Sequence, residues 1–128
     1  MSDLIHLVVP VHPSAATAGT GGSMYVSIQQ AGTYKLVDAA VNVGTTAAAN
    51  ATDYASIGIE FDGTNAVTDL TSESTAFTAG TQRDFTLSSG SALEVEGLTE
   101  LIEVTCTKAG SGVAIVGGLV SMAFEKIR

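Results

Sequence analysis

The chain has 128 residues, which is room for one domain of ordinary size, and Ala, Gly, Ser and Thr make up nearly half of it. It has one Cys and two His, so the composition excludes a disulfide scaffold and a Cys/His metal cluster. Thirteen acidic residues against five basic ones give a net charge of −8, which argues against a protein that binds nucleic acid through its phosphates or an acidic membrane surface.

The first apolar run covers residues 4–9 and predicts a strand. It is interrupted by His6 and is too short for the apolar segment of a secretory signal or for a membrane-spanning helix. We therefore expect a chain made in the cytoplasm and not inserted into a membrane.

The next predicted strands show alternation of apolar and polar residues. They cover residues 24–28, 35–43 and 56–62, and for the second of them the pattern predicts an apolar face of Val37, Ala39, Val41 and Val43. Residues 30–33 read as the turn of a hairpin between the first two strands. Residues 62–65 (Asp-Gly-Thr-Asn) predict a tight turn after the third.

The second half repeats this pattern at residues 84–88, 101–107 and 119–125. Residues 91–94 have the spacing of a capping box, but Gly97 follows closely, so we expect one helical turn at most. The sequence thus predicts an all-β, single-domain antiparallel β-sandwich of about seven to eight strands with little or no helix. Residues 1–128 form the one domain, with residues 1–23 as a candidate extended N-terminal arm.

The residue types that usually carry catalysis or bind metals do not form a recognisable site. His6 and His12 have no third ligand at a fitting spacing, and Cys106 lies on the apolar face of its strand, where a thiol acts as a small hydrophobe. The glycine-rich segments 19–22 and 108–112 lack the rest of a phosphate-binding motif and are better explained as turns. We expect no metal and no cofactor.

Acidic residues are densest between residues 94 and 103, where four Glu occur. Paired carboxylates could hydrolyse a glycosidic bond, but the chain has no Trp and few other aromatic residues to line a sugar-binding cleft. Asp62, Asn65 and Asp69 do not have the spacing of a twelve-residue calcium loop. We therefore expect a solvated acidic edge and a protein that is not an enzyme.

The C-terminal third resembles a known family. Residues 101–112 (LIEVTCTKAGSG) followed by 117–125 (GGLVSMAFE) are similar to the ending of small tailed-bacteriophage capsid decoration, or cement, proteins, and residues 33–40 and 50–61 resemble their middle strands. Residues 93–98 are more acidic than that family's pattern. The resemblance implies a β-sandwich of jelly-roll type that binds the major capsid protein on the outer surface of the head as a homotrimer, and stabilises contacts between capsomers of the virion.

Under this hypothesis we expect the N-terminal segment to face the capsid, because an apolar strand ending in prolines suits addition to another sheet. The predicted contact residues are Leu4, Ile5, His6, Leu7, Val8, Val9, Pro10, His12 and Pro13. An ordinary edge strand of the chain's own sandwich explains residues 4–9 equally well. The alternatives for function are a tail or head-fibre component, and a carbohydrate- or receptor-binding module, for which Tyr25, Tyr34 and Tyr54 are the tyrosines at hand.

Overall fold

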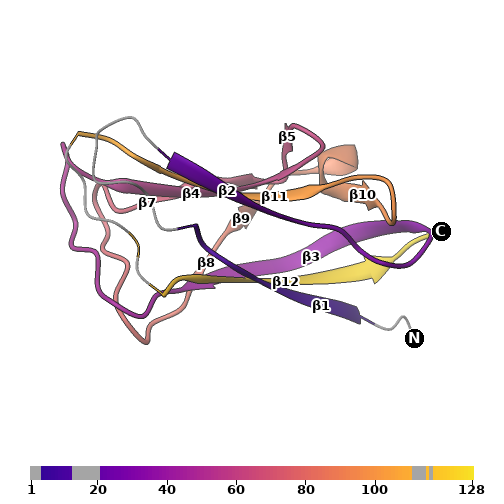
Figure 1. Ribbon diagram of the computed structural model, residues 1–128, viewed down its shortest axis with the longest axis horizontal. Coiled ribbons are helices and arrows are strands. Elements are labelled where there is room, and N and C mark those ends of the chain that lie inside the picture. The colour runs from indigo at the N-terminus through magenta and orange to yellow at the C-terminus, as the bar shows by residue number, and fades with distance from the viewer. Residues whose placement is uncertain (1–3, 13–20, 111–114, 116) are drawn as a thin grey trace.

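The computed structural model describes residues 4–12, 21–110, 115 and 117–128, and it is an antiparallel β-sandwich (Figure 1). The long strands are β1 (Leu4–Pro10), β2 (Gly21–Val26), β3 (Thr33–Asn42), β4 (Ala55–Phe61), β11 (Ile102–Lys108) and β12 (Leu119–Lys126). The short elements are β5 (Thr64–Asn65), β6 (Val67–Thr68), β7 (Leu70–Thr71), β8 (Arg83–Asp84), β9 (Thr86–Leu87), β10 (Glu94–Glu96) and the 3-10 turn η1 (Gly90–Leu93). The predicted all-β class is confirmed.

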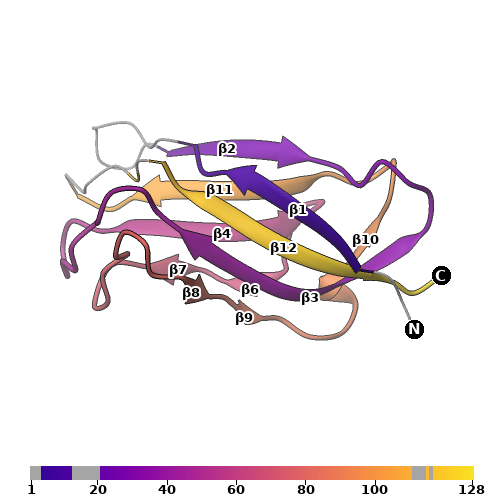
Figure 2. The same ribbon diagram turned by 90° about the horizontal axis from the view of Figure 1, so that it is seen from below.

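The strands form two main sheets, which Figure 2 shows from the side of β1, β12 and β3. Sheet A has the order β1-β12-β3-β10, with β8 also on β3, and sheet B has the order β2-β11-β4-β5, with β7 also on β4. Counted along the chain, the eight strands on these two paths lie in the orders 1-8-3-6 and 2-7-4-5. This arrangement, in which the first strands alternate between sheets, is a jelly roll, as predicted.

The predicted hairpin at residues 30–33 is wrong. β2 lies in sheet B and β3 in sheet A, so this segment crosses from one sheet to the other. The segment after β10 holds it there, because Gly97 donates its N–H to the Gly32 carbonyl at 2.8 Å and Leu98 donates to the Ile28 carbonyl at 2.8 Å. Alternation along a strand shows which face is buried, but it does not show which strand is the neighbour.

The predicted apolar face of β3 is only partly right. Ala39, Val41 and Val43 are buried, but Val37 is 36% exposed and Leu36 is fully buried in its place. The cause is a β-bulge: successive β12 residues pair with Asp38 and Leu36, so Val37 has no partner opposite it. A bulge of one residue reverses the faces of a strand on one side of it, which a strict period of two does not predict.

The turn at residues 62–65 is confirmed. Asp62 and Gly63 both have positive φ, at 49° and 87°, and form the two-residue connection between β4 and β5. Positive φ at both central residues is typical of the hairpin turns whose twist matches that of the strands. The strand predicted around Phe85 is divided into β8 and β9, which pair with β3 and β6 respectively, while Phe85 itself is buried.

The core lies between the two sheets and consists mainly of Val, Ile, Leu and Ala with all four Phe. The rings of Phe61 and Phe124 bring the sheets together, with centroids 5.8 Å apart and planes tilted by 43°. Cys106 is fully buried on the inner face of β11, as expected of a thiol that acts as a hydrophobe.

Candidate interaction surface

The strands β1 and β2 end their sheets on the same side of the sandwich, and among the described strands neither has a second hydrogen-bonded neighbour (Figures 1 and 2). We call the surface formed by residues 4–10 and 21–26 the open side. None of these residues is Asp, Glu, Lys or Arg, in a chain with a net charge of −8. At the other end of sheet A, β10 carries Glu94 and Glu96, and such charges discourage the addition of a further strand.

Within the described part of the chain, no strand pairs with the outer edge of β1. Val11 donates its N–H to the Gly118 carbonyl at 2.8 Å, in register with the pairing of β1 and β12. Because hydrogen-bonded and non-bonded positions alternate in an antiparallel pair, the backbone groups of Leu4, His6 and Val8 point away from β12. Pro10 occupies the next such position, so its missing N–H costs no hydrogen bond within the sheet.

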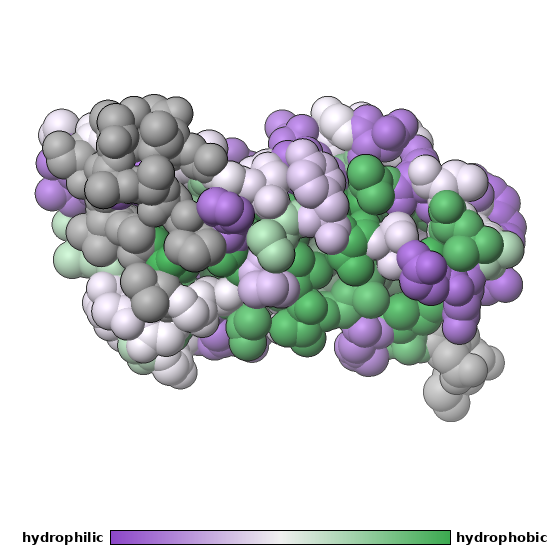
Figure 3. Space-filling view, in the orientation of Figure 1, coloured by the Kyte–Doolittle hydropathy of each residue, from purple (hydrophilic) through white to green (hydrophobic). Residues whose placement is uncertain are grey.

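The side chains of the open side are largely apolar. Leu4 and Val8 are 48% and 59% exposed, and Ile5 and Leu7 are half-buried against the core. Met24 and Val26 of β2 are likewise partly buried and pack against the core. Figure 3 shows the result as a hydrophobic band across the middle of the face on which β1 and β2 lie.

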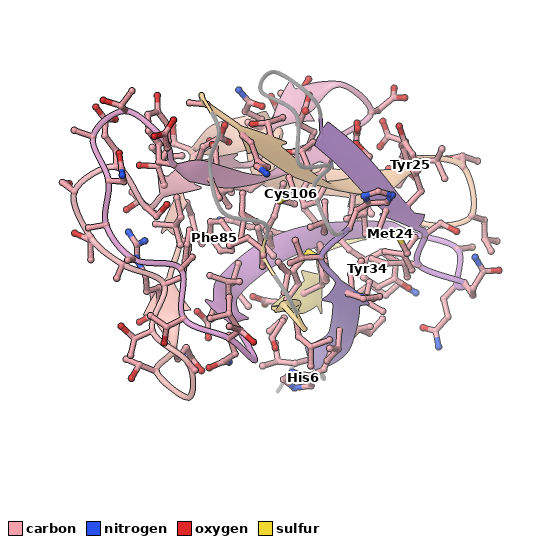
Figure 4. All side chains as sticks on the ribbon, turned by 60° about the vertical axis from the view of Figure 1, so that its left-hand side comes forward. His6, Met24, Tyr25, Tyr34, Phe85 and Cys106 are labelled. Atoms are coloured by element: carbon pink, nitrogen blue, oxygen red, sulfur yellow. The ribbon has the colours of Figure 1, made fainter. Side chains whose placement is uncertain are left out.

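The predicted contact segment therefore has two kinds of residue. Val9 is buried and belongs to the core, whereas His6 is exposed on the outer face of sheet A (Figure 4). His12 is partly buried: its ring lies over Gly22, and its Nδ1 has no hydrogen-bond partner within the described part of the chain. Pro13 lies outside the described residues. That this segment contacts a capsid stays a prediction.

A shallow hollow of about 250 Å³ lies beside β1 on the outer face of sheet A. Small residues at its floor, Ala40, Ser121 and Ala123, create the space between β1 and Gln82. It holds His6 and Asp38 at its sides, on strands separated by β12. The hollow therefore extends from β1 across β12 to β3, away from the outer edge of β1.

The acidic stretch is engaged in surface contacts. Glu94 forms an ion pair with Arg128 at 2.7 Å, and Glu100 accepts a hydrogen bond from the Glu96 N–H at 2.7 Å. Glu103 accepts hydrogen bonds from the hydroxyls of Ser23 and, at 3.2 Å, Tyr25. A hollow of about 210 Å³ does adjoin Glu94 and Glu100, but these contacts tie both carboxylates to neighbouring groups.

The oxygens considered for calcium serve separate structural roles. Asp62 is in the left-handed turn after β4, whereas Asp69 lies over Gly58, where a Cβ would collide with its carboxylate. Burial raises the pKa of Asp69, and a hydrogen bond from Ser56 partly opposes that effect. Among the described residues, no three or more His, Cys, Asp and Glu side chains come together in a way that could hold a metal ion.

The exposure of the tyrosines bears on the alternative of a carbohydrate- or receptor-binding module. Of the three tyrosines, Tyr25 is 59% exposed on sheet B, while Tyr34 is fully buried between the sheets. Within residues 4–12, 21–110, 115 and 117–128, no helix has the length and hydrophobicity to cross a membrane.

Comparisons with known proteins add little to these observations. No family model matches the chain, and no curated protein is similar to it. Among solved structures, the crystal structure of a protein from Sulfurospirillum deleyianum aligns over 97% of this chain and 98% of its own, with a TM-score of 0.35 and 9% sequence identity. A likeness at this level carries no argument about fold or function.

Sequence patterns indicated that residues 4–9 form a strand, but they did not show that β2 would lie beside it. The open side results from the jelly-roll order, which places the ends of two sheets on one side. The absence of charge in both segments is the signal that could have indicated a common surface.

Proposed function

We propose that the chain is a non-enzymatic structural protein of a bacteriophage virion that decorates the outer surface of the capsid and stabilises contacts between capsomers. The proposal rests on the resemblance of residues 101–125 to cement proteins and on the jelly-roll order of the strands. Jelly rolls are common in viral capsid proteins, although a fold alone does not define a function.

The observation that carries the proposal is the free, uncharged edge of β1. A strand of the major capsid protein that adds to this edge would gain main-chain hydrogen bonds from His6 and Val8, with apolar contacts beside them. Each contact is small, but many copies on one head, each bridging neighbouring subunits, hold the shell together collectively. The net negative charge keeps the protein from competing for the packaged DNA.

A pair of substitutions at one position tests this role. Val8→Pro removes an N–H that points to solvent and leaves the hydrogen bonds between β1 and β12 in place, whereas Val8→Thr keeps the N–H and a β-branched side chain. We expect Val8→Pro to lose binding to expanded empty heads and Val8→Thr to retain it, as measured by co-sedimentation. Equal binding of both folded variants would contradict strand addition at β1, and no binding of the wild-type chain would contradict the proposed function.

Placement on the virion separates the proposal from a tail or head-fibre role. Gold-labelled chain on the head surface in electron micrographs is the expected result, and label confined to the tail would contradict it. A carbohydrate-binding role receives less support, because Tyr25 is the one strongly exposed aromatic side chain of the described residues. Saturable binding on a glycan array would favour that role instead.

A further inference from the structure

We propose that, in the free protein, the edge of β1 pairs with β1 of a second copy of this chain, in antiparallel orientation about a two-fold axis at Leu7. The inference concerns the same edge as the proposed function. Pairing of two copies would regulate capsid binding, because a capsid strand would have to displace the second copy. The pairing itself depends on residues 4–10 alone and does not require the capsid role to be correct.

The electrostatics of the strand favour a second copy as the occupant. Two chains that each carry a net charge of −8 repel each other over most of their surfaces. Residues 4–10 contain no formal charge at pH 7, and the neighbouring β2 contains none either, so the open side is where like-charged copies approach at the lowest cost. A basic partner would find no counter-charge along this edge.

The register also makes the strand complementary to itself. With Leu7 opposite Leu7, the pairs are Leu4 with Pro10, Ile5 with Val9 and His6 with Val8, so every residue of β1 has a partner. The outward-pointing positions 4, 6, 8 and 10 then face one another, which is what antiparallel hydrogen bonding requires. Pro10 accepts from the Leu4 N–H and has no donor to leave unpaired.

The same register continues the apolar layer across the axis. Ile5, Leu7 and Val9 are on the core side of β1, and in the pair they lie opposite Val9, Leu7 and Ile5 of the second copy. The half-buried Ile5 and Leu7 are thereby covered. A register centred on His6 would instead place the two imidazoles opposite each other and pair Val9 and Pro10 with residues 3 and 2, which lie outside β1. The register centred on Leu7 is therefore favoured.

A two-fold contact of this kind closes on itself and predicts a dimer. Sedimentation equilibrium should give twice the mass of one chain for the wild type and for Val8→Thr. Val8→Pro should sediment as a folded monomer, with a circular dichroism spectrum like that of the wild type and a Tm that, unlike the wild type's, does not rise with protein concentration. A wild-type monomer at every concentration, a trimer as the resemblance implies, or a dimer that persists in Val8→Pro would overturn the inference.

Cross-linking tests the axis separately. Opposed residues of a non-hydrogen-bonded pair have Cα atoms about 4.5 Å apart, within the range of a disulfide, whereas positions displaced by two residues are about 7–8 Å apart. Leu7→Cys should therefore form a disulfide-linked dimer with a mild oxidant and His6→Cys should not, while the wild type, with Cys106 buried, serves as the background. Cross-linking of His6→Cys but not Leu7→Cys would refute the axis. Dimerisation without capsid binding would leave this inference standing and refute the proposed function.

Discussion

The replacement of Gly97 by Ala tests the way in which the connection between the two sheets is held. A Cβ at this position would collide with the backbone carbonyl oxygen of Gln30 and would lie 3.1 Å from Cε2 of the fully buried Tyr34. Neither neighbour is the free end of a flexible side chain, so the backbone segments at residues 30–32 and 97 must separate. That movement weakens the hydrogen bond from the Gly97 N–H to the Gly32 carbonyl.

The expected loss in the free energy of unfolding of Gly97→Ala has two contributions. Overpacking a close contact costs about 1–3 kcal/mol, and a weakened backbone hydrogen bond adds about 1 kcal/mol. We therefore expect Gly97→Ala to lower the free energy of unfolding by about 2–4 kcal/mol and the Tm by about 10 °C. Urea and thermal unfolding, followed by circular dichroism, measure both quantities.

Gly80 provides the matched control. It has a φ of +77° and nothing within 4 Å of a Cβ, so Gly80→Ala adds left-handed backbone strain of about 1 kcal/mol and no collision. If Gly97→Ala destabilises the protein no more than Gly80→Ala does, the close approach of the two segments does not determine the stability of this connection.

Three further substitutions are expected to change the free energy of unfolding or its pH dependence. Arg83 donates to a backbone carbonyl at 2.8 Å and lies 4.6 Å over the Phe77 ring, so Arg83→Met should cost about 1–3 kcal/mol. Burial raises the pKa of Asp69, so the folded state binds the proton of this carboxyl group more tightly than the unfolded state does. The contribution of Asp69 to the free energy of unfolding therefore falls as the pH rises from near 3.8 through the raised pKa. Asp69→Asn should remove that fall in urea titrations. Phe124→Ala removes a fully buried ring that packs on Phe61 and should cost about 3–5 kcal/mol by the same titrations.

Surface substitutions serve as controls for these changes. Arg128→Met breaks an ion pair in which Arg128 is mainly exposed, and Leu119→Ala shortens an exposed side chain, so each should change stability by less than about 1 kcal/mol. A loss at Arg128 as large as that at Arg83 would contradict the role given to the partly buried guanidinium of Arg83. An unchanged pH dependence in Asp69→Asn would show that burial of this carboxylate does not affect folding.

The sequence allowed prediction of the strands that have a strict alternation and a clear turn, such as residues 56–62 with the Asp62-Gly63 connection. It did not allow prediction of features that depend on the partner strand. The bulge opposite Val37 depends on β12, and the crossing at residues 30–33 depends on contacts with Gly97. The candidate surface was predicted only in part: the segment of residues 4–13 was singled out, but the proximity of β1 to β2 is a property of the topology.

The pairing of β1 with β12 also has a consequence for how the chain folds. Of the described strands, β1 is synthesised first and β12 last, and β1 has no other neighbour in its sheet. β1 therefore cannot pair within sheet A until β12 has been synthesised. The long loop between them must close before their contacts form, and this makes folding slow. During that delay an uncharged strand is exposed on both edges in every nascent chain, and crowded ribosomes would bring several such strands together. We expect folding yield, rather than final stability, to be most sensitive to residues 4–10.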